Sequence, residues 1–253
     1  MSPSIWTQCA GPSRARRLTG RFRRVVEAQF RNSTRQLVDS DEEQRTLEVL
    51  LDARAKLPVP SGFEGLHYLL YTPFRHPPLR NGSRFGTRQE RGILYAAREL
   101  PTAFAEVAYY RLVFLEGTKA VLSPLTVDLT AFSFRIAAAR GIDLSEEPFR
   151  SFEARISSPV SYGDSQGLGA AMRADGVQAC LYVSARARGR RVNLAVFENV
   201  FRPPRPLDEQ RWTCTATTER VEFRAQRLLG NEEGHAYERS QFLWNGKLPA
   251  PAL

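Results

Sequence analysis

Cysteine is scarce in this chain of 253 residues. The three cysteines are Cys9, Cys180 and Cys214. They are odd in number, lie far apart and form no CxxC or other metal-ligand spacing. This pattern argues against structural zinc and against a disulfide framework, and it favours a reducing compartment.

Several familiar catalytic signatures are also lacking. The three histidines, His67, His76 and His235, do not cluster, and the sequence has neither an HExxH motif nor a Walker phosphate loop. These absences argue against a zinc hydrolase of the HExxH type and against a P-loop nucleotide-binding protein.

Long apolar runs are missing as well. No stretch approaches the roughly 18–20 apolar residues of a membrane span, and the first residues contain no apolar core of a signal peptide. We therefore expect a cytoplasmic protein that does not associate with a membrane.

Lysine supplies only three of the 36 basic residues, and the formal net charge is +9. So strong a bias towards arginine is also explained by genomic composition, and a site for a small phosphorylated ligand fits the charge at least as well as a nucleic-acid surface. Six arginines lie close together near the N-terminus: Arg14, Arg16, Arg17, Arg21, Arg23 and Arg24. We interpret this stretch as a solvated basic segment, with a nucleic-acid-binding arm as the alternative.

The first quarter of the chain predicts an extension to the main domain. Residues 1–38 have no regular pattern, whereas Ser40 and Glu43 form a capping box that starts a helix. The Pro- and Gly-containing stretch at 58–62 then marks a boundary. We expect residues 1–65 to be an N-terminal helical extension packed on a domain formed by residues 66–253.

The rest of the chain is expected to contain short strands and helices. Strands are expected at residues 66–71, 92–97, 132–137, 178–183, 192–197, 212–217 and 220–223, and helices at about 102–115 and 161–176. Strands outnumber helices and do not alternate strictly with them, so the pattern favours an α+β fold over a doubly wound sheet.

The stretch 72–111 carries the strongest functional signal. Arg84 lies in a Gly-rich turn, Tyr95 on a short apolar strand, and Glu106 in an apolar helix, at two equal intervals of eleven residues. Because a strand that runs into a helix can bring these residues to one end of a sheet, we predict that they line one pocket.

Glu106 and Arg84 each have a plainer interpretation. An acid in a helix that is apolar on both faces is either paired inside the protein or lines a cleft, so a buried ion pair with an arginine is the alternative for Glu106. Small residues around Arg84 let a ligand approach its guanidinium. An exposed arginine in a hairpin turn is the alternative for Arg84.

Two further segments are candidates for a binding site or a catalytic residue. Ser184 and Arg186 leave the end of a predicted strand, where they are well placed to bind an anionic group. Gly163-Asp-Ser165-Gln-Gly167 matches the nucleophile elbow of hydrolases, but a proline and three serines replace the apolar strand that an elbow requires. We therefore place Ser165 in the first turns of a helix.

These residues together resemble the RES-domain family, the toxin halves of bacterial toxin–antitoxin pairs, over roughly residues 66–200. The matching residues are Arg84 in Gly-Ser-Arg-Phe, Tyr95 in Leu-Tyr-Ala, Glu106 in Thr-Ala-Phe-Ala-Glu and Ser184 in Tyr-Val-Ser-Ala-Arg. Arg75 is similar to the family's earlier arginine, and residues 193–197 are similar to the strand that follows the serine. Phe85-Gly86 departs from the Trp-Asn of many members.

The resemblance implies an α+β fold of mixed, mainly antiparallel sheets with flanking helices around an NAD cleft, similar to ADP-ribosyltransferase toxins. It implies catalytic roles for Glu106, Arg84 and Ser184. The residues expected to contact NAD+ are Arg75, Arg84, Tyr95, Ser184 and Arg186.

The function implied is that of a toxin that degrades NAD+ by cleaving the nicotinamide–ribose bond, by phosphorolysis or hydrolysis. NAD+ is then the substrate, inorganic phosphate is the co-substrate of phosphorolysis, and no separate cofactor or metal is expected. The implied protein partner is a helix-turn-helix antitoxin of the Xre type, with no direct binding of nucleic acid. An ADP-ribosyltransferase and a non-enzymatic, Arg-rich nucleic-acid binder are the alternatives.

Overall fold

The computed structural model describes residues 3–28, 40, 42–43, 46, 58–76, 80–118, 124–226 and 233–251. The helix predicted after the capping box lies almost entirely outside these residues, although the Ser40 hydroxyl does accept a hydrogen bond from the Glu43 N–H, at 3.2 Å. No helix in the described ranges is long and apolar enough to span a membrane.

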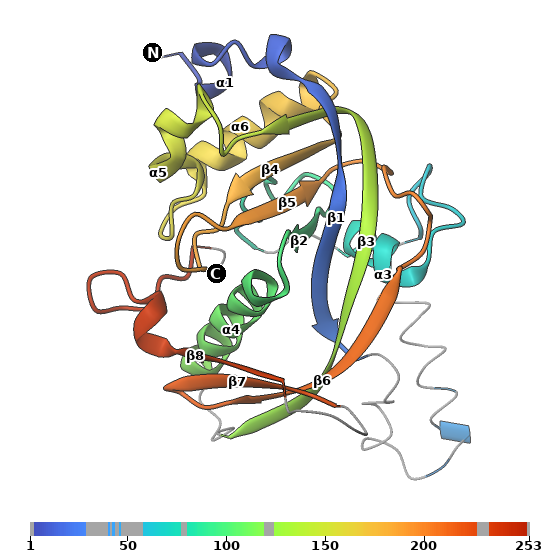
Figure 1. The fold of residues 1–253 in the computed structure, drawn as a ribbon, viewed down its shortest axis with the longest axis vertical. Helices are drawn as coiled ribbons and strands as arrows, with labels where there is room; N and C mark the ends of the chain where they lie inside the picture. Colours follow the sequence, from blue (N-terminus) through green and yellow to red (C-terminus); the bar gives the residue numbers. More distant parts are fainter. Residues whose placement is uncertain are drawn as a thin grey trace.

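One mixed, mainly antiparallel sheet of eight strands organises these residues (Figure 1). The strands are β1 (Arg16–Glu27), β2 (Leu94–Ala97), β3 (Leu125–Asp143), β4 (Ala179–Val183), β5 (Val192–Val196), β6 (Asp208–Ala216), β7 (Arg220–Ala225) and β8 (Gly234–Glu238). Their order is β1-β2-β5-β4-β3-β6-β7-β8, and β1 also pairs with β3, so the first five strands close into a ring. Among the described strands, only β3 and β4 pair in parallel.

Five α-helices accompany the sheet in the described residues: α1 (Ile5–Gln8), α3 (Tyr68–Arg75), α4 (Leu100–Gly117), α5 (Glu153–Ile156) and α6 (Gly163–Ala174). Short 3₁₀ turns complete the chain: η1 (Gly11–Arg14), η3 (Phe149–Phe152) and η4 (Arg239–Phe242). The predicted α+β class with mixed, mainly antiparallel strands is confirmed.

The N-terminal prediction is wrong for residues 16–27. These residues form β1, which runs antiparallel to β3 from the Arg16–Gly141 pair to the Glu27–Leu129 pair. The strand was missed because its arginines obscure an alternating pattern in which Leu18, Phe22 and Val26 face the core. Residues 16–27 are therefore part of the central sheet and not of a helical extension.

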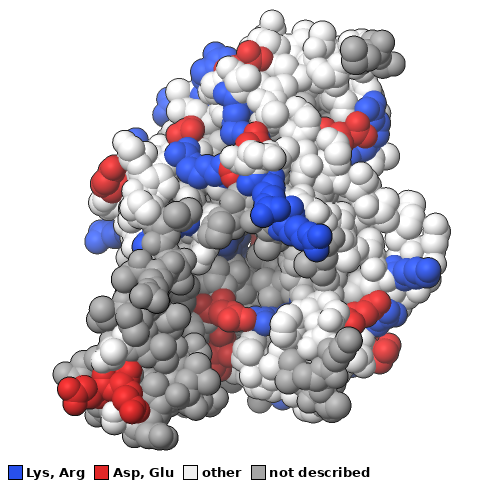
Figure 2. All heavy atoms as spheres, turned by 180° about the vertical axis from the view of Figure 1, so that it is seen from behind, with Lys and Arg blue, Asp and Glu red and all other residues white. Residues whose placement is uncertain are grey.

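The arginines of β1 also argue against a free basic arm. Arg16 pairs with Glu146, and Arg21 pairs with Asp208. Figure 2 shows acidic side chains among the basic ones across the face opposite to that of Figure 1. Much of the arginine charge is thus compensated locally rather than gathered into one uninterrupted surface.

Strand β3 is longer than the sequence indicated. The predicted strand at 132–137 is the middle of a 19-residue strand whose first half pairs with β6 and whose end pairs with β4. Small residues lower the strand propensity of its second half, but Gly141 is required there, because a Cβ would lie 2.3 Å from the Cβ of Leu18. Pairing with β1 therefore decides the conformation.

Helix α3 replaces the strand predicted at 66–71. His67 caps the helix by accepting a hydrogen bond from the Leu69 N–H at its Nδ1, at 3.4 Å. Leu69, Leu70 and Phe74 are buried against the sheet. A short apolar run fits either a strand or a buried helix turn, and here tertiary packing selects the helix.

Helix α4 positions the candidate site. It begins at Leu100, two residues before the predicted start, so Thr102 lies within its first turn. Phe104 and Leu112 pack with Trp212 and Phe223 of β6 and β7 in an apolar core. Figure 1 shows α4 between the β2–β5–β4 part of the sheet and the β6–β7–β8 part.

Candidate functional site

A cavity of about 430 Å³ lies between α4, β1 and the ends of β2, β4 and β5. Its lining includes all three residues of the evenly spaced set, Arg84, Tyr95 and Glu106. The other polar or aromatic lining residues are Arg24, Glu27, Ser83, Tyr110, Arg111, Phe114, Tyr162, Tyr182 and Asn193. The cavity is within the size range of small-molecule sites.

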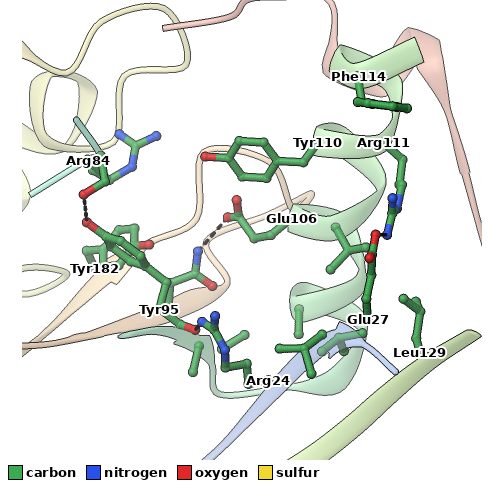
Figure 3. Close-up of a pocket in the computed structure, with 18 of the residues that line it drawn as sticks. Arg24, Glu27, Arg84, Tyr95, Glu106, Tyr110, Arg111, Phe114, Leu129 and Tyr182 are labelled. Atoms are coloured by element: carbon green, nitrogen blue, oxygen red, sulfur yellow. Dashed lines mark hydrogen bonds and ion pairs between the residues drawn. The ribbon is translucent and has the colours of Figure 1, made fainter. Parts of the chain in front are cut away.

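Glu106 projects from α4 into this cavity (Figure 3). Its Oε1 accepts hydrogen bonds from the Ser184 hydroxyl at 2.6 Å and from Asn193 Nδ2 at 2.7 Å. No cation in the described part of the chain forms an ion pair with it. The alternative of a buried ion pair with an arginine is therefore wrong, and both partners of this carboxylate are neutral.

Ser184 holds the carboxylate rather than lining the cavity. Its oxygen donates to Glu106 and accepts from the backbone N–H groups of Arg186 and Ala187, both at 3.1 Å. The hydroxyl is thus occupied by these three hydrogen bonds at the turn that follows β4. We assign it a positioning role for Glu106.

Asn193 fixes the same carboxylate from β5, where it pairs with Ala97 and Tyr182 in the neighbouring strands. Its amide nitrogen donates to Glu106, while its Oδ1 is buried and accepts no hydrogen bond from a described residue. Because buried polar atoms are nearly always paired, this oxygen is a candidate acceptor for a ligand donor.

Arg84 is 7% exposed and lies in the wall of the cavity, not in an exposed turn. Its Nη1 donates to the carbonyl oxygens of Ile156 at 3.0 Å and Ser158 at 3.1 Å, and its guanidinium lies 4.8 Å from the ring centre of Tyr162. Ser83 and Gly86 pair across a tight turn as in a hairpin, but the alternative of an exposed arginine in that turn is wrong. Nε and Nη2 make no hydrogen bond to a described residue and are free to bind an anion.

Tyr95 connects the two arginines of the site. Its hydroxyl accepts from the Phe85 N–H at 3.0 Å and hydrogen-bonds Ser83 Oγ at 2.9 Å, which fixes the turn that carries Arg84. Its carbonyl oxygen accepts from Arg24 Nη1. Burial raises the pKa of the Tyr95 hydroxyl, so it stays protonated at neutral pH.

Arg24 was missed as a site residue in the sequence. It lies on β1 among the positions that face inward, and burial lowers the pKa of its guanidinium to about 10, which leaves it charged at neutral pH. Its Nε is buried and donates to no described residue. The strand alternation with Phe22 and Val26 is the signal that could have identified it.

Besides Ser184, two residues expected to contact NAD+, Arg75 and Arg186, are not among those that line the cavity. Arg75 ends α3, with its guanidinium 5.7 Å from the ring centre of Tyr71. Arg186 is buried, stacks 3.6 Å from the ring centre of Tyr109 and donates to the Pro159 carbonyl at 2.9 Å. Arg24, which the sequence analysis did not assign to the site, lines the cavity, whereas Arg75 does not.

Helix α6 holds the turn that carries Arg84. Gln166 donates to the carbonyl oxygens of Asn81 and Ser83, and Arg173 donates to that of Phe85 at 2.7 Å. Ser165 is fully buried within the first turns of α6 and donates to the Tyr162 carbonyl, as expected for a helical serine and not for a nucleophile.

Gly169 allows the close approach of α6 to this turn. A Cβ at this position would lie 2.0 Å from the Phe85 carbonyl oxygen. Gly169→Ala is therefore expected to cost about 2 kcal/mol of stability and to lower Tm by roughly 4–8 °C in a thermal melt. Gly167→Ala in the same helix meets nothing within 4 Å and should leave Tm equal or raise it. Equal effects of the two substitutions would contradict the assigned contact.

Comparisons with known proteins agree with the resemblance seen in the sequence. A model of the RES domain family matches residues 59–216. The crystal structure of the M. tuberculosis MbcT-MbcA toxin-antitoxin complex aligns with 86% of this chain and 94% of its own, at 13% identity and a TM-score of 0.48. A similarity this low carries no weight for function. No curated protein matches the sequence.

Proposed function

Since the family model covers more than half of its residues, this chain belongs to the RES domain family, and from that premise we propose that it cleaves the nicotinamide–ribose bond of NAD+. The observation that carries the proposal is the placement of Glu106, held by neutral hydrogen-bond donors, in a cavity that Arg24 and Arg84 also line. Family members are known to degrade NAD+, and this cavity offers suitable groups.

A single carboxylate suffices for this reaction. Nicotinamide leaves a pyridinium as a neutral molecule, so it needs no general acid, whereas ordinary glycosidases require a second carboxyl group for an alkoxide leaving group. The bond electrons move to the ring nitrogen, and positive charge develops on the ribose. Glu106, with Oε2 free of hydrogen bonds to described residues, is suited to bind the ribose hydroxyls and to stabilise that charge.

The arginines match the anionic part of the substrate. Arg24 and Arg84 line the same cavity, and no described residue accepts a hydrogen bond from Arg24 Nε or from Arg84 Nε and Nη2. Guanidinium groups form paired hydrogen bonds with phosphate oxygens. We assign Arg24 to the pyrophosphate and, if phosphate is the nucleophile, Arg84 to the positioning of that phosphate.

The groups around Glu106 favour a nucleophile that is already anionic. Burial raises the pKa of Tyr95 and of Tyr182, so neither hydroxyl serves as a base at neutral pH. Glu27, the other carboxylate among the described lining residues, pairs with Arg111. Hydrogen phosphate needs no deprotonation before attack, whereas water does; we therefore propose phosphorolysis, which forms nicotinamide and ADP-ribose 1″-phosphate.

Products formed in two buffers distinguish the nucleophiles. Purified protein is incubated with NAD+ in phosphate and in a phosphate-free buffer, and the products are separated by chromatography. We expect ADP-ribose 1″-phosphate in the first buffer and at least tenfold slower nicotinamide release in the second. Free ADP-ribose at equal rates in both would indicate hydrolysis, and label retained on an acceptor would indicate an ADP-ribosyltransferase.

We further propose, from family membership, that the chain is a toxin neutralised by an antitoxin of the Xre helix-turn-helix type. Induced expression in a bacterial host should deplete cellular NAD+ and arrest growth, whereas induction of the Glu106→Gln variant should do neither. Growth arrest by both forms at equal protein levels would separate toxicity from NAD+ cleavage.

A further inference from the structure

The cavity continues beyond the groups that surround Glu106. Six of its apolar lining residues, here called the apolar end, come from β1, α4 and β3: Val25, Val26, Ala103, Val107, Phe114 and Leu129. Figure 3 places Phe114 and Leu129 on the side opposite to Arg84, next to the ion pair between Glu27 of β1 and Arg111 of α4. The proposed cleavage chemistry makes no use of these side chains.

The polar and apolar parts follow one another along α4 and β1. Successive residues of an α-helix are rotated by about 100° about the helix axis. Relative to Glu106, the rotation about the axis of α4 is about 80° for Phe114, about 100° for Val107 and about 140° for Arg111. Along β1, Arg24 and Glu27 are about 10 Å apart. Figure 3 shows the same order, with Arg84 and Tyr95 at one side, Arg24 between, and Glu27 and Arg111 at the other.

Phe114 is an unusual residue for this position. Its side chain is 51% exposed although it borders a cavity, whereas most large apolar side chains in the described residues are buried. A planar ring that entered the apolar end would cover it. Aromatic rings pair favourably in stacked or edge-to-face arrangements.

We propose that the apolar end binds the adenine ring of NAD+, an inference that rests on the proposed function. Cleavage at Glu106 places the nicotinamide ribose beside that residue. The pyrophosphate occupies the middle of the dinucleotide, as Arg24 occupies the middle of the cavity. The adenine ring is then at the opposite end, against Phe114.

A shortened substrate tests this order. Nicotinamide mononucleotide, NMN, has the scissile bond but no adenylate, so the apolar end contributes nothing to its cleavage. The Phe114→Ala variant is expected to lower the ratio of kcat/KM for NAD+ to kcat/KM for NMN about tenfold. Trp244→Ala is the matched control, because Trp244 is 52% exposed and lies outside the cavity lining. It should leave the ratio within twofold.

A ratio of kcat/KM for NAD+ to kcat/KM for NMN that is unchanged in Phe114→Ala would overturn the proposal. Equal losses of kcat/KM on the two substrates would also overturn it, because they would place the nicotinamide ring in the apolar end instead.

Calorimetric titration with 5′-AMP gives a readout that does not require turnover. Phe114→Ala should weaken 5′-AMP binding about tenfold relative to the unaltered protein and to Trp244→Ala. If the unaltered protein binds 5′-AMP as expected but cleaves neither NAD+ nor NMN, the proposed function fails and the adenine site stands. If it does not bind 5′-AMP, the adenine site fails.

Discussion

Replacing Glu106 by glutamine is expected to slow nicotinamide release from NAD+ by at least about a hundredfold, because the substitution removes the negative charge that stabilises the developing ribosyl cation. The substitution should preserve the fold. The glutamine carbonyl oxygen can still accept from the Ser184 hydroxyl and from Asn193 Nδ2, the two groups that hold Oε1. Single-turnover kinetics and a thermal melt measure the two effects separately.

Stability is the control for this variant. Tm should stay within about 2 °C of that of the unaltered protein, since no buried cation loses its partner. Loss of activity together with a fall of many degrees in Tm would indicate a structural role. Retained activity would remove Glu106 from the mechanism altogether.

Arg24→Met is expected to lower kcat/KM for NAD+ roughly 30-fold, mainly through KM. The guanidinium is the charged group at the middle of the cavity, and hydrogen bonds to charged groups contribute about 1.5–3 kcal/mol. Tm should not fall much, because the substitution also removes a buried Nε that has no partner among the described residues. Steady-state kinetics at several NAD+ concentrations separates KM from kcat.

Arg23→Met is the matched control for charge. Arg23 is the preceding residue of β1, and it is not among the residues that line the cavity. The two variants lose the same charge from neighbouring positions. Equal losses of kcat/KM would show that general electrostatic attraction, and not a contact in the cavity, explains the effect.

The central part of the candidate site was predictable because it is local in sequence. Arg84, Tyr95 and Glu106 come from a turn, a strand and a helix that follow one another directly, and all three line the cavity. Their catalytic roles stay predictions. The sequence could not show that Ser184 is occupied by three hydrogen bonds, since this depends on how the turn after β4 meets α4.

Arg24 illustrates what the sequence concealed. Its strand, β1, pairs with β3, which lies more than one hundred residues later in the sequence. No local sequence pattern indicates such a partner. Arginines at the outward positions of β1 then made the whole segment look solvated. The interpretation of α3 as a strand has a different cause, because a six-residue apolar run carries too little periodicity to decide between helix and strand.

The most direct test of the account is the release of nicotinamide from NAD+ by the purified chain in phosphate buffer, followed by chromatography over time. We expect steady release by the unaltered protein, with one ADP-ribose 1″-phosphate formed for each nicotinamide, and almost none by Glu106→Gln. A folded protein that leaves NAD+ intact in phosphate and in phosphate-free buffer, with or without an added protein acceptor, would contradict it.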